Sequence, residues 1–189
     1  MNAGFMRQKS GAHRGAVLWL TGLSGAGKTT LARALEEELL RGTFHPVVLD
    51  GDEVRRGLSA DLGFSQEDRR ENNRRVAEVA RLMAAAGMIV IVALISPYRR
   101  DRTRARKVVE AADATFFEIF VDTPLAVCEG RDSKGLYKRA RADKIRDFTG
   151  VHAPYEKPRS PDVTVYPATD SVSESVTTVF HFFDKITTR

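Results

Sequence analysis

A glycine-rich turn between an expected strand and an expected helix constrains this chain more than any other feature. Residues 22–30 read Gly-Leu-Ser-Gly-Ala-Gly-Lys-Thr-Thr, which satisfies the pattern G-x-x-x-x-G-K-[ST]. The turn follows an apolar run at 16–20 and precedes a helix with leucines at 31, 35 and 39. In that context we expect a phosphate-binding P-loop rather than an ordinary glycine turn, because the N–H groups of the turn and the positive end of the helix dipole converge on phosphate oxygens.

The P-loop pattern assigns roles to individual residues. Lys28 is expected to place its charge on the β- and γ-phosphates of ATP, which makes it a candidate catalytic residue, and the Thr29 hydroxyl is expected to ligate Mg²⁺. The expected ATP-binding residues are Gly22, Leu23, Ser24, Gly25, Ala26, Gly27, Lys28, Thr29 and Thr30.

Two carboxylates follow the next expected strand, at 46–49. Asp50 and Asp52 would lie at the carboxyl edge of a parallel sheet, where ligands bind. Either could hold Mg²⁺ through water, and one could orient or deprotonate an attacking hydroxyl. We assign that catalytic role to Asp52, which lies further into the turn, while a polar turn with a helix cap is the alternative.

Length and composition favour one α/β domain at 15–189, after a flexible tail at 1–14 that lacks the apolar segment of a signal peptide. No apolar run approaches the roughly 20 residues that span a bilayer. The one cysteine, Cys128, excludes an internal disulfide and fits a reducing cytoplasm. We expect it to be a small buried side chain rather than a catalytic thiol.

The net charge of +5 is concentrated in one segment. Residues 131–159 contain nine Lys or Arg and four Asp or Glu, so the remainder of the chain is neutral. A solvated helix face or a nucleic-acid patch are the alternatives to a mobile lid over polyanionic ligands. With a P-loop in the same domain, the lid is the favoured interpretation.

The remaining pattern alternates strands with helices, which predicts a doubly wound, mainly parallel five-stranded sheet of the P-loop nucleotide-kinase type. The other expected strands are 88–95, 115–121 and 163–165. A helix is expected to start at Ser65 with a capping box, and its first turns carry Arg69, Asn72 and Asn73 on the face of Val76. That polar face indicates either ligand contact or a solvated helix end. Further expectations are a helix at 99–112, an N-cap at 122–124, and a closing helix whose apolar stripe is Val172, Val176, Val179, Phe183 and Ile186.

Taken together, the ordered motifs resemble the adenylylsulfate kinase family, over residues from about 15 to about 161. The segments that carry the resemblance are 22–29, 50–55, 62–65, 69–72, 95–97, 131–132, 134–137 and 147–150. The resemblance implies a phosphotransferase of sulfate assimilation that uses MgATP to phosphorylate the ribose 3′-hydroxyl of adenosine 5′-phosphosulfate (adenylylsulfate). It also suggests a cytoplasmic homodimer with no nucleic-acid or membrane partner.

The resemblance further implies site residues. Phe64 and Phe148 would stack on the adenine of the sulfonucleotide, Arg131 would cover the ATP base, and Ser96 matches a serine that some members are described as phosphorylating transiently. The full set implied to bind adenylylsulfate is Asp52, Arg55, Phe64, Arg69, Asn72, Ile95, Ser96, Lys134, Leu136 and Phe148. The chain departs from the family at Glu53, usually Asn, and at Asn73, usually apolar.

Two other functions compete with this interpretation. A GTPase switch should contain an Asn-Lys-x-Asp segment, and the sequence has none. A different small-molecule kinase or a polynucleotide kinase of the same architecture is the nearer alternative.

Overall fold

The structure is a computed structural model in which residues 14–187 are described, so the tail expected at 1–14 lies almost entirely outside the described residues. Five parallel strands form one sheet in the order β2-β3-β1-β4-β5. The strands are β1 (Ala16–Thr21), β2 (Pro46–Asp50), β3 (Ile89–Ala93), β4 (Thr115–Val121) and β5 (Val163–Val165). The predicted doubly wound sheet is confirmed.

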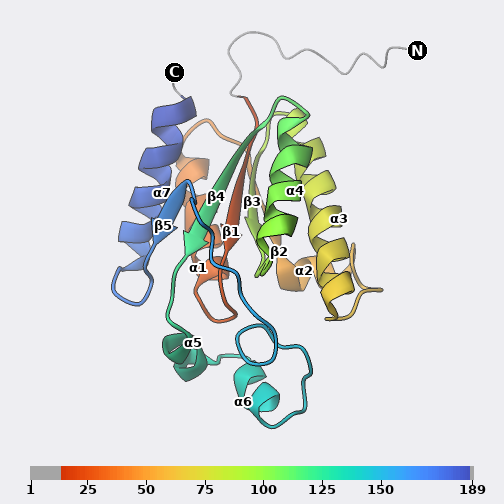
Figure 1. Ribbon diagram of the computed structural model, residues 1–189. Coiled ribbons are helices and arrows are strands. Elements are labelled where there is room, and N and C mark those ends of the chain that lie inside the picture. The colour runs from red at the N-terminus through yellow and green to blue at the C-terminus, as the bar shows by residue number, and fades with distance from the viewer. Residues whose placement is uncertain (1–13, 188–189) are drawn as a thin grey trace, which may run out of the picture.

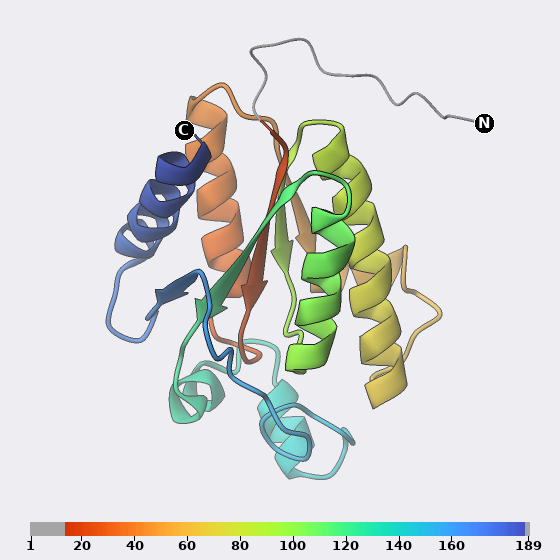
Figure 2. The same cartoon turned by 45° about the horizontal axis from the view of Figure 1, so that its top comes forward.

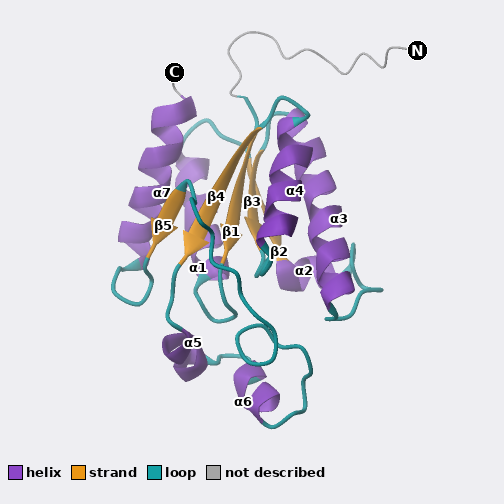
Figure 3. Cartoon of the chain, in the orientation of Figure 1, coloured by secondary structure: helices purple, strands orange, loops and turns teal. Residues whose placement is uncertain are grey.

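Two helical layers cover the sheet (Figure 1). Helices α1 and α7 lie on one face and α3 and α4 on the other, an arrangement that the tilted view in Figure 2 also shows. The short helices α5 and α6 lie beyond the carboxyl ends of the strands (Figure 3). The helices are α1 (Lys28–Arg41), α2 (Gly51–Arg56), α3 (Gln66–Ala85), α4 (Arg99–Glu110), α5 (Leu125–Arg131), α6 (Leu136–Arg141) and α7 (Val172–Thr187).

Strand β1 divides the core between the two layers. Its side chains alternate, so Leu18 and Leu20 pack in the cluster with α1 and α7, while Val17 and Trp19 pack in the cluster with α3 and α4. All six residues of β1 are buried, as expected for an inner strand of a parallel sheet. The buried strand therefore holds in place its carboxyl end, where the glycine-rich turn begins. No helix in the described part of the chain is long and apolar enough to cross a membrane.

Several local predictions are confirmed. The Ser65 hydroxyl caps α3 by accepting from the N–H of Asp68, as the expected capping box requires. In α7, the middle of the expected stripe is buried, whereas Val172 and Ile186 at its two ends are exposed.

The predicted cap of α5 is wrong. Pro124 occupies the N-cap position of α5, and no side chain caps the helix. The Thr123 hydroxyl instead donates to the carbonyl of Ala26, at 2.9 Å, and Asp122 pairs with Lys157. Both polar groups therefore serve long-range contacts at the carboxyl edge of the sheet, which compete with local capping.

Candidate active site

The glycine-rich turn connects β1 to α1 at the carboxyl edge of the sheet. Gly25 and Gly27 have φ values of 73° and 105°, which favour glycine. A Cβ on Gly25 would also lie 3.1 Å from the Cys128 carbonyl oxygen, and one on Gly22 would lie 2.6 Å from that of Val121. Conformation and close packing thus explain the glycines of the turn.

Lys28 lies inside the curve of this turn. Its side chain is buried, with the residue only 8% exposed, and its ammonium donates to the carbonyls of Gly22, at 3.0 Å, and Leu23, at 2.7 Å. Burial lowers the pKa of Lys28 to about 8. The ammonium therefore lies within the turn and donates to two neutral acceptors. A phosphate oxyanion would be a stronger acceptor for this ammonium than either carbonyl.

Thr29, Asp50 and Asp52 form a chain of contacts beside Lys28. The Thr29 hydroxyl donates to Oδ2 of Asp50 at 2.6 Å, and Oδ1 of Asp50 accepts from the N–H of Asp52 at 2.9 Å. Asp50 is buried and caps α2, as expected from the alternative of a polar turn with a helix cap. It also accepts from the hydroxyl of Thr29 in the P-loop. The carboxylate of Asp52 is exposed and forms an ion pair with Lys134.

The polar start of α3 is buried, so the alternative of a solvated helix end is wrong. Each guanidinium nitrogen of Arg69 donates one hydrogen bond: Nε to the carbonyl of Phe64 at 2.9 Å, Nη1 to the Thr149 hydroxyl at 2.8 Å and Nη2 to the carbonyl of Asp147 at 2.7 Å. Arg69 thereby fastens residues 147–149 of the basic segment to α3. Burial lowers the pKa of Arg69.

Asn72 and Asn73 lie on the same buried face of α3. Among the described residues, neither Oδ1 of Asn72 nor Nδ2 of Asn73 has a hydrogen-bond partner. Because buried polar atoms are normally paired, the free acceptor of Asn72 is suited to a ligand group. The role of Thr149 was not foreseen, because its contact partner Arg69 lies eighty residues away in sequence.

Phe64 and Phe148 occupy different environments. The ring of Phe64 is 58% exposed, and the Arg55 guanidinium carbon lies 4.4 Å from its centroid while its Nη1 donates to the Gly63 carbonyl. Phe148 is only 6% exposed and meets Tyr137 edge-on, with ring centroids 5.0 Å apart. Phe148 therefore belongs to the apolar core in this structure, whereas Phe64 is mostly exposed beside the guanidinium groups of Arg55 and Arg69.

The basic segment contacts the P-loop directly. The Tyr137 hydroxyl donates to the Ser24 carbonyl at 3.0 Å, and Arg131 reaches the carbonyls of Gly25, at 3.4 Å, and Pro167, at 2.5 Å. Leu136 is half-buried and packs against the core cluster on the α1 side. The contact of Tyr137 with the P-loop is not predictable from the segment 134–137, because nothing in the local sequence indicates a partner more than a hundred residues away.

Ser96 follows β3 in a strained turn. Its φ is 38°, the residue is 3% exposed, and its hydroxyl accepts from the indole N–H of Trp19 at 3.0 Å. The preceding residue, Ile95, is half-buried, and its carbonyl accepts from the Thr21 hydroxyl at 2.8 Å. The turn thus brings Ile95 and Ser96 to the same sheet edge as the P-loop.

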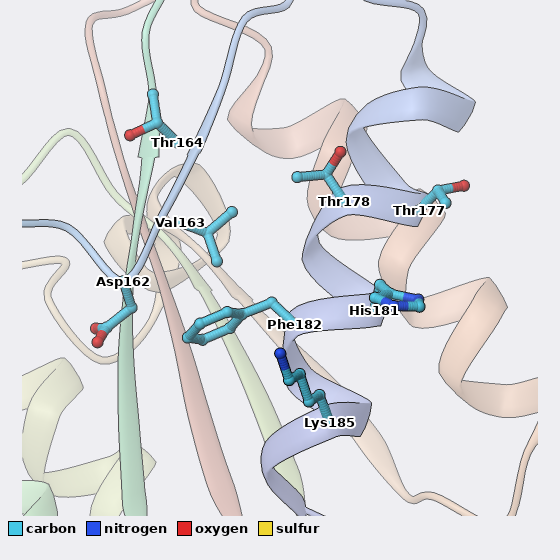
Figure 4. Close-up of a pocket in the computed structure, with 8 residues that line it drawn as sticks. All are labelled: Asp162, Val163, Thr164, Thr177, Thr178, His181, Phe182 and Lys185. Atoms are coloured by element: carbon cyan, nitrogen blue, oxygen red, sulfur yellow. The ribbon is translucent and has the colours of Figure 1, made fainter.

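A hollow of about 560 Å³ lies elsewhere, between β5 and α7 (Figure 4). Its lining residues are Asp162, Val163, Thr164, Thr177, Thr178, His181, Phe182 and Lys185. None of the site residues predicted from the sequence lines it. The candidate active site is instead an open edge between the P-loop, α3 and the basic segment.

Comparison with known proteins agrees with this geometry. The family model described as adenylylsulphate kinase matches residues 14–166. An adenylyl-sulfate kinase of Geotalea daltonii is 53% identical over 174 residues, which cover 92% of this chain and 85% of the relative. An adenylyl-sulfate kinase of Shewanella amazonensis is 58% identical over 153 residues, covering 81% and 76%. An APS kinase of Mycobacterium tuberculosis, solved in complex with AMPPNP and APS, superposes with a TM-score of 0.88 at 48% identity, covering 91% of this chain and 99% of that one.

Proposed function

Because this chain belongs to the adenylylsulfate kinase family, we propose how its own residues divide the work of the family's reaction. The protein is a phosphotransferase that moves the γ-phosphate of ATP to the ribose 3′-hydroxyl of adenylylsulfate, which gives 3′-phosphoadenosine 5′-phosphosulfate and ADP.

Residues 22–30 bind the triphosphate of ATP. Backbone N–H groups of the turn and the start of α1 would surround the β-phosphate, and Lys28 would exchange its two carbonyl acceptors for phosphate oxygens. Arg131, which reaches the carbonyls of the turn, would cover the ATP base. The charge of Lys28 would then follow the γ-phosphate through the transition state.

The oxygen donors beside the P-loop fit a magnesium ion. Mg²⁺ prefers oxygen ligands, and next to substrate phosphates it needs only one or two from the protein. Thr29, whose hydroxyl lies 2.6 Å from Oδ2 of Asp50, would be the direct ligand, and Asp50 would act through that contact or through water. The chemistry that a bound Mg²⁺ supplies is neutralisation of charge on the phosphate oxygens.

The position of Asp52 is the observation that carries the assignment. It follows the aspartate that holds Thr29 and pairs with Lys134 of the basic segment, so it stands between the donor side and the acceptor side of the site. An exposed carboxylate there can accept the proton of the 3′-hydroxyl or orient it in line with the γ-phosphorus. Lys134 would leave Asp52 for the acceptor's phosphosulfate, since an anion of higher charge competes for the same ammonium.

The acceptor nucleotide would bind along α3 and the basic segment. Phe64 offers its exposed ring to the adenine, with Arg55 beside it, and Asn72 offers an unpaired Oδ1. Arg69 would contact the sulfonucleotide while it holds residues 147–149. Ile95, Ser96 and Leu136 would border the ribose and the phosphosulfate, and Phe148 would reach the adenine only after it leaves Tyr137.

We further propose that the enzyme works in the cytoplasm, where ATP is available, and as a homodimer, as the family resemblance suggests. Light scattering coupled to size exclusion tests the second point, because a monomer of 21.0 kDa and its dimer differ twofold in mass.

Acceptor choice tests the function. Purified enzyme with MgATP should convert adenylylsulfate, whereas AMP, a shikimate-like alcohol and a 5′-hydroxyl oligonucleotide should remain unphosphorylated under the same conditions. Affinity for adenylylsulfate should also vary little with salt, unlike polynucleotide binding, whose affinity falls steeply with salt concentration. Preferred turnover of any of the other three acceptors would overturn the proposed function.

A further inference from the structure

Arg102 of α4 is a buried cation at the junction of three segments that meet at the carboxyl edge of the sheet. It is 2% exposed. Its Nε donates to the Glu118 carboxylate of β4 at 2.5 Å, its Nη1 to the carbonyl of Ser96 at 2.6 Å, and its Nη2 to the carbonyl of Glu156 at 2.8 Å. A planar fork that serves three acceptors at once is a property of arginine that lysine lacks.

The first segment that Arg102 holds is the turn after β3. Ser96 adopts a φ of 38°, a region that a non-glycine residue occupies only when its surroundings impose it. The two shortest hydrogen bonds to Ser96 come from Arg102, which donates to the Ser96 carbonyl, and from the Trp19 indole, which donates to its hydroxyl. The Thr21 hydroxyl adds a longer bond, of 3.4 Å, to the Ser96 carbonyl. Arg102 therefore helps to fix the conformation of a turn whose side chains border the proposed acceptor site.

The second segment that Arg102 holds is 155–157, near the end of the basic segment. The N–H of Glu156 donates to the Pro97 carbonyl at 2.8 Å, and its carboxylate accepts from the N–H of Arg99 at 2.9 Å. Arg102 adds the bond to the Glu156 carbonyl, and its guanidinium carbon lies 5.9 Å from the centroid of the neighbouring Tyr155 ring. The turn after β3 and residues 155–157 are thus tied into one unit.

We propose that Arg102 is a positioning residue for the acceptor nucleotide, acting through the Ser96 turn and through residues 155–157, where the basic segment is tied to that turn. This role depends on the proposed function of those segments. Arg102 touches neither nucleotide; it sets where Ile95 and Ser96 meet adenylylsulfate and where the basic segment is anchored. Loss of the Arg102 side chain should weaken acceptor binding and leave ATP binding unchanged, because none of the described hydrogen bonds of Arg102 reaches the P-loop.

A matched control lies one turn further along α4. Arg106 also joins the helix to the sheet, donating to the Phe116 carbonyl at 2.9 Å and to the Asp162 carboxylate at 2.5 Å. It makes no described contact with Ser96 or Glu156. Arg102→Lys and Arg106→Lys therefore remove the same kind of side chain from the same helix, and only the first touches the proposed unit.

The test measures both KM values and amide hydrogen exchange for wild type and the two variants. Arg102→Lys should raise KM for adenylylsulfate about tenfold, since displacement of binding groups by about 1 Å carries penalties of this order or more, and should leave KM for ATP within about twofold. Exchange at 95–99 and 153–158 should accelerate at least about tenfold. Arg106→Lys should leave both KM values and exchange at these segments within about twofold.

A rise in both KM values would show a disturbance that reaches beyond the acceptor side, and equal effects of the two substitutions would show one that is not specific to Arg102; either result would overturn the proposal. If Arg102→Lys does not fold, Glu118→Gln tests the same point, because it keeps the volume and an acceptor oxygen while it removes the charge that holds Arg102. It should raise KM for adenylylsulfate in the same direction and by less, and an unchanged value would also overturn the proposal. If the wild type fails to phosphorylate adenylylsulfate, the proposed function falls, and the exchange comparison alone decides whether Arg102 organises the two segments.

Discussion

The indole N–H of Trp19 donates a 3.0 Å hydrogen bond to the hydroxyl of Ser96, and both residues are buried. The hydroxyl that a phosphoserine route would need is therefore already engaged beneath the sheet edge. No histidine or other base lies among its described hydrogen-bond partners. This contact favours direct transfer of the phosphoryl group between the two nucleotides.

Ser96→Ala should accordingly lose less than about tenfold in kcat, because the hydroxyl makes no proton transfer in the direct route. Its cost should fall on stability instead, by about 1–3 kcal/mol, since the Trp19 N–H loses its acceptor. Steady-state kinetics and thermal unfolding check the two effects. Abolished turnover together with a trapped phosphoserine and ping-pong kinetics would contradict the direct route.

Lys28→Ala should remove the charge that follows the γ-phosphate. The expected loss is about 3 kcal/mol of transition-state stabilisation, or upwards of about a hundredfold in kcat/KM. The variant should remain folded, because Lys28 contributes only two hydrogen bonds to carbonyls in the structure. Retention of more than about a third of wild-type kcat/KM would refute the role of Lys28.

The pH dependence of ATP use should reveal the same residue. Since burial lowers the pKa of Lys28 to about 8, the free enzyme loses its ammonium above that pH, and kcat/KM for ATP should fall as the pH rises from 8 to 10. The effect of rising pH on folding stability has the opposite sign. Between the folded pKa and the usual value of 10.5, the unfolded chain binds more protons, so the free energy of unfolding should rise with pH relative to Lys28→Met. A kcat/KM that stays flat to pH 10 would contradict this pKa.

Asp52→Asn keeps the size of the side chain and deletes its charge. If Asp52 accepts or orients the proton of the 3′-hydroxyl, kcat should fall about a hundredfold or more. Stability should hardly change, because the pair with Lys134 is exposed and surface ion pairs contribute about 0–1 kcal/mol. If only the affinity for nucleotide changes, the role passes to Asp50.

Phe64→Ala and Phe148→Ala should share one effect and differ in another. Loss of base stacking, worth about 1–3 kcal/mol, should raise KM for adenylylsulfate about five- to a hundredfold in each variant and barely change KM for ATP. Only Phe148→Ala should also destabilise the fold, by about 3–5 kcal/mol, because Phe148 is buried against Tyr137. Equal effects on both KM values would place these rings outside the acceptor site.

The glycine-rich turn, the sheet and the long helices were predictable because they depend on local signals, whereas the short helices α2 and α6 were not predicted. Local sequence determines the conformation within a few residues at the glycines at 25 and 27, at the capping serine at 65 and along the unbroken apolar run of β3. The predicted N-cap at 122–124 was wrong for the opposite reason. The partners of Asp122 and Thr123 are Lys157 and the carbonyl of Ala26, which no local pattern reveals.

The contacts within the candidate site were less predictable than the fold. Asp50 was expected to serve either as a cap or beside the metal, and it has the geometry for both, because its two carboxylate oxygens face different partners. The engagement of Arg69 with residues 147–149 and of Tyr137 with Ser24 could not be predicted, since each joins segments that only the folded sheet edge brings together. The burial of Phe148 was missed because it lies in no regular apolar stripe.

The most direct test of the central claim is the position of the phosphate on the product. Wild-type enzyme incubated with MgATP and adenylylsulfate should yield ADP and a new phosphomonoester whose ³¹P signal couples to the ribose H3′ proton, and Lys28→Ala should yield neither above its residual rate. A phosphate on any other position, or hydrolysis of ATP without a phosphorylated sulfonucleotide, would contradict the account.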